Sequence, residues 1–301
     1  MNEQIENSGT WRKFLRFPIV KILIGAISLI ASVGIAQMII GFLPVADSPL
    51  MTLLATGLVI LVAFLTYVAF VRIMEKRAVT ELSFVGALRE TAIGMGVGTL
   101  LFGTTIGILW LLGYYDVVGV NKLAVVVPVL TTAVSAGVIE ELLFRGIFFR
   151  IVEERWGTWL ALSLTSLFFG LVHLFNPNAT FVAGIAIALE AGVLLGAAYI
   201  FTRRLWLAIG IHFAWNFVQG GIFGVAVSGN EAQGLLRSTL TGPDFLSGGQ
   251  FGAEASIIAV IVCLAAGLIL LKQASNRGQF VKPAAKNRPQ VQMMTPPLPN
   301  E

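Results

Sequence analysis

The 301-residue sequence is poor in charge, cysteine and histidine. Charged residues make up 12% of it, against about 25% in an average soluble domain. Hydrophobic residues make up 56%, and the mean hydropathy is +0.86. This balance excludes an ordinary soluble domain and indicates a membrane protein. The single cysteine, Cys263, cannot form an intrachain disulfide, so the fold does not use an oxidising compartment.

The sequence also lacks a cleavable signal peptide and an internal repeat. The first apolar run begins near Ile19 and is not followed by a small-residue cleavage pattern, so it is predicted to be a retained span. Eight apolar runs are each close to the roughly 20 residues that cross a bilayer. They lie at about 19–42, 51–74, 91–113, 123–150, 157–175, 180–201, 205–223 and 254–271. The predicted fold is all-α, a polytopic bundle of about eight transmembrane helices.

This pattern divides the chain into three parts. Residues 1–16 form a polar N-terminus, 17–272 the membrane-embedded helical domain, and 273–301 a tail predicted to be disordered from its Pro, Gln and Asn content. Placing both termini in the cytoplasm puts eighteen of the twenty basic residues on that side, leaving only Lys122 and Arg237 outside. The net charge of +4 therefore reflects helix ends, and no nucleic-acid partner is expected.

Two adjacent acids, Glu140 and Glu141, stand inside the fourth apolar run. A carboxylate at bilayer depth costs roughly 2.5–3.5 kcal/mol on insertion scales. Residues four apart share a helix face, so Glu141 is expected to pair with Arg145. Glu140 points about 100° away and has no partner in its own helix. An unpaired intramembrane carboxylate indicates a functional site, although a buried ion-pair network joining helices is the alternative.

Both histidines of the chain lie in other apolar runs. His173 is near the end of the fifth run, and His212 lies in the seventh, four residues before Asn216 and on the same helix face. If Glu140 and these three residues converge, they can satisfy one another at a lower cost than separate buried polar groups. Such a set can perform hydrolysis, because a carboxylate accepts a proton from water, an imidazole orients the water, and His and Asn donate to an oxyanion.

The same residues leave other interpretations open. Glu140, His173 and His212 could bind Zn²⁺, since two histidines and one glutamate form a catalytic zinc site. The residue four from His212 is Asn216, a poor zinc ligand, so no metal or other cofactor is expected. A non-catalytic membrane scaffold or immunity protein could use the same groups to join helices. Glu190, in the sixth run, either supports the site or faces a wet cavity.

Three motifs, in this order, resemble the CAAX protease and bacteriocin-processing (CPBP) family, also called the type II CAAX prenyl endopeptidase or Abi family. They lie within residues 123–223 and consist of Glu140-Glu141 with Arg145, Phe169 with His173, and His212 with Asn216. The family is traditionally labelled metalloprotease, whereas its eukaryotic prenyl-protein members resemble glutamate-dependent enzymes without zinc.

The resemblance implies an intramembrane endopeptidase that cuts a membrane-associated or lipidated peptide or protein. It implies that Glu140 activates water beside His173 and that His212 and Asn216 stabilise the oxyanion, supported by Glu141, Arg145 and Phe169. The expected partners are membrane lipid and the peptide substrate, in a prokaryotic plasma membrane, with cleavage near the cytoplasmic side.

The expected depths of Glu140 and His173 in the membrane do not agree. At about 1.5 Å per residue, Glu140 lies about 15 Å from Arg150, whereas His173 lies about 24 Å from Gly157. The fifth helix is therefore expected to tilt or to begin deep in the membrane.

Overall fold

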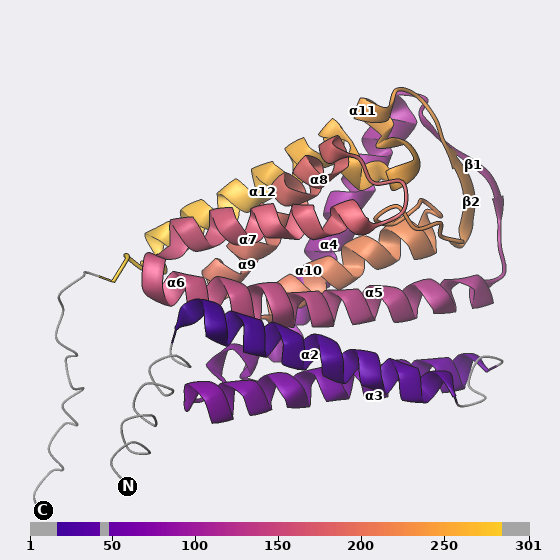
Figure 1. Ribbon diagram of the computed structural model, residues 1–301. Coiled ribbons are helices and arrows are strands. Elements are labelled where there is room, and N and C mark those ends of the chain that lie inside the picture. The colour runs from indigo at the N-terminus through magenta and orange to yellow at the C-terminus, as the bar shows by residue number, and fades with distance from the viewer. Residues whose placement is uncertain (1–16, 43–47, 285–301) are drawn as a thin grey trace, which may run out of the picture.

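The computed structural model shows a bundle of helices and describes residues 17–42 and 48–284 (Figure 1). The predicted N-terminal segment 1–16 and residues 285–301 of the predicted tail lie outside the described residues. The long helices are α2 (Pro18–Gly41), α3 (Pro49–Phe70), α4 (Ala87–Leu111), α5 (Val126–Glu141), α7 (Thr158–Val172) and α12 (Ile257–Asn276). The shorter α-helices are α6 (Arg150–Trp156), α8 (Phe181–Ile187), α9 (Val193–Thr202), α10 (Trp206–Asn216) and α11 (Asp244–Ser247).

Several of these helices are joined end to end by π-helical or 3₁₀ segments. The π-helical segments are η1 (Val71–Glu75), η4 (Leu142–Phe149), η6 (Ala188–Gly192) and η7 (Phe217–Ile222). The 3₁₀ segments are η2 (Thr80–Leu82), η3 (Leu123–Val125), η5 (His173–Phe175), η8 (Gly249–Phe251) and η9 (Ala253–Ala255).

Within the described residues, seven helices are long and apolar enough to cross a membrane, which confirms a polytopic helical bundle. They match the first six expected spans and the last, and the fourth is longer than expected, at Leu123–Trp156. The expected span at 205–223 is shorter, because it consists of α10, with 11 residues, continued by η7, with 6. α2 and α3 pack side by side along α5, and α7, α9 and α12 lie beyond α5 (Figure 1).

One end of the bundle carries a layer of ion pairs, here called the ionic layer. Arg150 bonds Glu75 at 2.5 Å and Glu154 at 2.9 Å, and Arg77 bonds Glu81 at 2.6 Å. The turn between α9 and α10 joins this layer, since Arg203 bonds Glu153 at 2.6 Å and Arg204 pairs with Glu90. The layer ties together the α3–α4 connection, α6 and the α9–α10 turn at the same end of the bundle.

The opposite end carries a two-stranded antiparallel sheet that the all-α prediction did not include. β1 (Tyr115–Val120) pairs with β2 (Leu236–Leu240), with Tyr115 opposite Leu240 and a register shift between Val117 and Gly119. The Gly- and Ser-rich stretch before α12 thus contains a strand. Since β2 lies at this end and Arg203 at the other, the chain crosses the bundle between them despite the short α10.

The turn between α6 and α7 resolves the conflict of depths. The fourth span does not end near Arg150 but continues to Trp156, and Gly157 turns the chain with φ of +83°. Glu140 and His173 are then about equally far from this turn along their helices, roughly 25 Å at 1.5 Å per residue. The two helices reach the same depth with no unusual start for α7.

Residues 273–284, which belong to the predicted disordered tail, have a defined structure. α12 extends to Asn276, and the Thr158 backbone N–H donates to the Val281 carbonyl at 3.0 Å. The Val281 N–H donates to the Thr158 hydroxyl at 2.8 Å. The chain at Val281 therefore packs against the start of α7.

Candidate active site

A cavity of about 690 Å³ lies between α5, α10, η5 and the loop 227–233. Its walls include all four residues predicted from the sequence to carry the chemistry, namely Glu140, His173, His212 and Asn216. They come from three separate helical segments, and the sequence separations of 33 and 39 residues between Glu140, His173 and His212 are closed only by the fold. The structure thus brings the predicted residues together around one space.

Glu141 is the buried hub of this cluster. Its side chain is 0% exposed, and its Oε1 accepts from Arg145 Nη1 at 2.8 Å, as the four-residue spacing predicted. The same oxygen accepts from His212 Nδ1 at 2.9 Å, a contact between helices that the sequence did not indicate. Because an ionised carboxylate only accepts, Nδ1 of His212 carries a hydrogen and its Nε2 turns toward the cavity.

Glu140 differs from its neighbour by facing the cavity. Its side chain is 32% exposed, and its Oε2 lies 3.9 Å from His212 Nε2. That oxygen is nevertheless buried and accepts no hydrogen bond from the described residues. A buried carboxylate oxygen without a donor is costly, and the residue that carries it lines a space large enough for water or a substrate.

His173 is held by its own helix. Its Nδ1 donates to the Phe169 carbonyl at 2.6 Å, and the two rings lie 4.7 Å apart. A carbonyl oxygen only accepts, so the hydrogen sits on Nδ1 and Nε2 keeps a lone pair in the neutral ring. The Arg145 guanidinium lies 4.8 Å over the Phe169 ring, which links this histidine to the Glu141 hub.

Arg145 also reaches a third helix. Its Nη2 donates to the carbonyls of Ala191 and Gly192 at 3.2 and 3.1 Å. Gly192 also lets η6 pack closely on α7, because a Cβ there would lie 2.8 Å from Ser166 Cα. The Arg145 side chain therefore joins the Glu141 hub to a closely packed pair of helices.

The chemical residues stand next to the π-helical segments. η4 begins immediately after Glu141, Glu190 lies within η6, and η7 begins immediately after Asn216. A π-helical turn has one residue more than an α-turn, which rotates the residues that follow and recurs at functional sites. Because of this change of period, residues before and after a π-helical segment face different directions than they would in a continuous α-helix.

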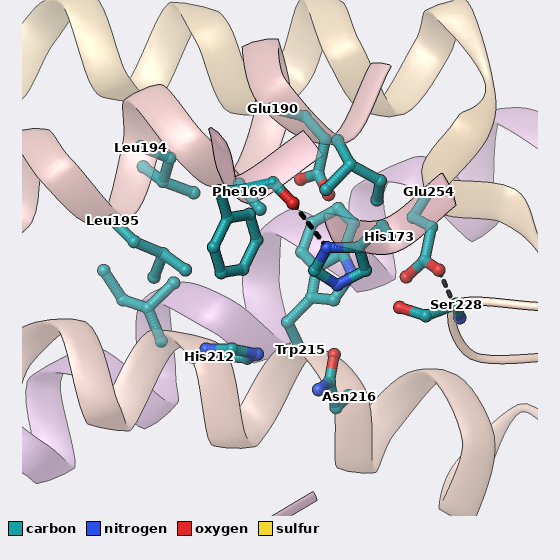
Figure 2. A pocket seen from close by; sticks show the side chains of 13 residues that line it. Phe169, His173, Glu190, Leu194, Leu195, His212, Trp215, Asn216, Ser228 and Glu254 are labelled. Carbon is teal, nitrogen blue, oxygen red and sulfur yellow. Dashed lines mark hydrogen bonds between the residues drawn. The ribbon is translucent and has the colours of Figure 1, made fainter. Parts of the chain in front are cut away.

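Sequence reasoning missed a second acid behind the cavity. Glu254 and Glu190 both line a smaller space of about 20 Å³ that His173, His212 and Asn216 also line (Figure 2). A space of about 10–15 Å³ is enough for one water molecule. Glu190 thus lines a water-sized space that it shares with three of the predicted site residues, which fits both interpretations of this acid. Glu254, in the η9 turn, gave no such signal because it stands at the first position of the last apolar run, at the edge of the predicted span.

Glu254 also holds the loop that covers the cavity. Its Oε1 accepts from the backbone N–H of Ser228, which lines both spaces. Burial raises the pKa of the Glu254 carboxyl to about 7, despite the Ser228 hydrogen bond that favours its ionised form. Near neutral pH this acid therefore exists in both protonation states.

A metal site needs three or more ligating side chains grouped around one point. Within residues 17–42 and 48–284, no three His, Cys, Asp or Glu side chains are grouped so that they could hold one. The fourth predicted residue at the cavity, Asn216, supplies a neutral amide. The residues present do not fit the zinc site that Glu140, His173 and His212 would have to form.

The segment that carries these residues is similar to a known protein family. Residues 122–218 match the family described as type II CAAX prenyl endopeptidase Rce1-like. This segment is an Rce1-like domain. No curated protein and no solved structure matches the chain.

The Rce1-like domain confirms the resemblance that the motifs suggested at 123–223. It contains η3 through the start of η7, and with them Glu140, His173, His212 and Asn216. α2, α3 and α4 precede it, and the loop 227–233 and Glu254 follow it. The domain supports a CAAX-type intramembrane protease at the level of the family.

Proposed function

We propose that the protein is an intramembrane endopeptidase that hydrolyses a peptide bond with a water molecule activated by Glu140. The observation that carries the proposal is the single cavity lined by Glu140, His173, His212 and Asn216, with Glu140 Oε2 unbonded beside it. The Rce1-like domain supports the same class of reaction.

In this mechanism Glu140 is the general base. A water bound in the cavity gives one proton to the Glu140 carboxylate, while the Nε2 lone pair of His173 accepts its second hydrogen and orients it. The water oxygen attacks the peptide carbonyl carbon, and the carbonyl electron pair moves to the oxygen. When the C–N bond breaks, the proton on Glu140 passes to the leaving nitrogen.

The oxyanion is placed against His212 and Asn216. Glu140 and Glu141 are carboxylates, and Arg145, bonded to Glu141, is the guanidinium of this cluster, so a protonated His212 brings the net charge of these four groups to zero. In that state Nε2 donates toward the cavity together with the Asn216 amide. Loss of one such donor typically costs about 10²–10³ in kcat.

The proposed substrate is a membrane-associated or lipidated peptide or protein, reached in the presence of membrane lipid. Because seven helices among the described residues are long and apolar enough to cross a membrane, the cavity is proposed to lie within the bilayer or at its edge. Both termini and the Arg203-Arg204 turn are proposed to be cytoplasmic, because the ionic layer then lies on the side that positive residues favour.

The deciding experiment compares membranes that contain the wild type with membranes that contain Glu140→Gln at the same level of folded protein. Gln keeps the size of Glu but cannot accept the proton, so peptide termini generated by the wild type are expected to decrease by about 10²–10⁴. His212→Ala and Asn216→Ala should each give an intermediate loss. A set of termini unchanged by Glu140→Gln would instead favour a non-catalytic scaffold or immunity protein.

A further inference from the structure

The smaller space behind the cavity combines two acids with an unused hydrogen-bond donor. Glu190 enters it from η6 and Glu254 from η9, and both side chains are buried (Figure 2). The Trp215 side chain lines the same space and lies beside the Glu254 carboxyl group. Its indole Nε1 is buried and donates to no described residue. Because a buried donor without an acceptor costs free energy, this nitrogen indicates that a further polar group belongs in the space.

Glu190 is not explained by the stability of the bundle. Its side chain is 3% exposed, and neither lysine nor arginine is among the described residues that line the space. Glu254 at least accepts a hydrogen bond from the Ser228 backbone N–H. Burying a carboxyl group without a cation costs free energy unless hydrogen bonds satisfy it. The presence of Glu190 therefore also points to a polar ligand in this space.

The size and the chemistry of the space select a water molecule as that ligand. A volume of about 20 Å³ holds one water and little else. A buried water makes about three hydrogen bonds. Here the Trp215 N–H can donate to it, and the carboxyl oxygens of Glu190 and Glu254 can accept from it. A metal ion fits less well, because no three ligating side chains are grouped within the described residues.

This space adjoins the proposed catalytic cavity. Four residues line both spaces, namely His173, His212, Asn216 and Ser228. Glu140 lines the larger space only. A water in the smaller space is therefore separated from the larger cavity by the side chains that the two spaces share.

We propose that Glu190, Glu254 and Trp215 form a water-binding site, and that its water supplies the hydrolysis while a substrate occupies the larger cavity. A peptide bound in the larger cavity displaces water from it, whereas a water behind the shared wall stays within reach. The supply role rests on the proposed function, but the binding of water at this site does not.

The first experiment locates the water without any cleavage. A density map of the purified protein that shows ordered waters should contain one peak within hydrogen-bond distance of Trp215 Nε1 and of a carboxyl oxygen of Glu190 or Glu254. Trp215→Phe, which removes the N–H and keeps an aromatic ring, should weaken or abolish this peak. A wild-type map that shows other buried waters but none here overturns the inference, even if cleavage by the protein is established.

The second experiment tests the supply role. Glu190→Met keeps about the length of the side chain but offers no strong hydrogen bond, whereas the control Glu190→Gln keeps a polar end. The substrate is a peptide that spans the strongest Glu140-dependent cleavage site found in membranes. For Glu190→Met, kcat should fall about 10-fold, as expected for the loss of one hydrogen bond to the water. The KM should not change, because the peptide binds in the larger cavity.

Thermal unfolding separates this role from a structural one. Glu190→Met removes a buried acid, so its unfolding temperature should equal or exceed that of the wild type, and Glu190→Gln should resemble the wild type in both measurements. A wild-type kcat in Glu190→Met overturns the supply role. A lowered unfolding temperature with a matching loss of folded protein also overturns it, because Glu190 would then be a structural acid. An absence of any Glu140-dependent cleavage overturns the protease and the supply role together, while the map still decides whether the site binds water.

Discussion

At the scale of single residues, two neighbouring glutamates have opposite surroundings. Glu141 is fully buried and its Oε1 is bonded to Arg145 and His212, whereas the Glu140 side chain is 32% exposed and lines the cavity. The difference follows from the rotation of about 100° between successive helical residues, which turns one carboxylate to the core and the other to the cavity. Position along the helix, more than residue type, separates a structural acid from a chemical one.

Substituting each glutamate by glutamine should separate these roles. Glu141→Gln leaves Arg145, which is 1% exposed, without its charge partner. Breaking a buried pair costs about 3–5 kcal/mol, so the unfolding temperature in detergent should decrease strongly. Glu140→Gln should unfold close to the wild-type temperature yet lose cleavage. If Glu141→Gln were stable and inactive while Glu140→Gln remained active, the base would be Glu141.

Metal dependence is also decided by the residues at the cavity. Because Asn216 is a poor ligand for zinc, cleavage is expected to survive prolonged treatment with a strong chelator. The measurement is the cleavage rate of purified protein before and after chelation, alongside its zinc content. Zinc bound at one ion per chain, lost together with activity and restored with it, would support the alternative site of Glu140, His173 and His212.

At the scale of elements, the position of α10 depends on its contact with α4. Gly98 of α4 lies against the α10 backbone, and a Cβ there would be 2.5 Å from the Ile211 carbonyl oxygen, next to His212. Gly98→Ala should therefore force the two helices apart and lower stability by about 1–3 kcal/mol.

The same helix provides a matched control. A Cβ at Gly103 would meet no atom within 4 Å, so Gly103→Ala should be neutral or stabilise the helix by up to about 1 kcal/mol. Thermal unfolding and cleavage are measured for both variants. Equal effects at the two positions would show that packing of α4 against α10 does not position His212.

Helical periodicity predicted the positions of residues correctly where both residues lie on the same helix. The bond between Glu141 and Arg145 and the position of His212 and Asn216 at one cavity follow from a spacing of four, and they required no tertiary information. The bond between Glu141 and His212 joins two helices 71 residues apart, and nothing in either run specifies their mutual rotation.

Other features of the structure were not predicted because their sequence signals are weak. β1 and β2 are short, and the segments between apolar runs indicate turns more clearly than strands. Glu254 lies in a Gly-rich stretch where an acid is unremarkable by composition, and only its burial behind His173 gives it importance. The extension of the fourth span to Trp156 escaped because Arg150 resembles a membrane boundary, although its charge is neutralised by Glu75 and Glu154.

At the scale of the whole molecule, the ionic layer should make stability depend on pH. Glu81 is buried and accepts hydrogen bonds from Arg77 and Tyr67. Burial alone raises its pKa, but these hydrogen bonds outweigh it and leave the pKa below the usual value of 4.5. A depressed folded-state pKa contributes stability above pH 4.5, and this contribution is lost as the pH falls through the lower value.

The prediction is tested with Glu81→Gln, which cannot ionise. Its unfolding temperature should be well below that of the wild type at pH 7, and the gap should narrow as the pH falls below about 4.5, near the usual glutamate pKa. The difference between the two proteins isolates Glu81 from the other acids, including Glu254. A gap that is independent of pH would show that the carboxylate charge of Glu81 does not stabilise the layer.

The pairing of β1 with β2 also sets an order of events during synthesis. Glu140, His173 and His212 are all made before the loop 227–233, and β1 must wait for Leu236–Leu240 before it can pair. At roughly 5–20 residues per second, the 100 positions from Glu140 to Leu240 take on the order of 5–20 s. During that interval the nascent chain already holds the proposed catalytic residues but lacks the loop 227–233 that lines the cavity. The two strands can therefore pair only after every described residue that lines the cavity has been made.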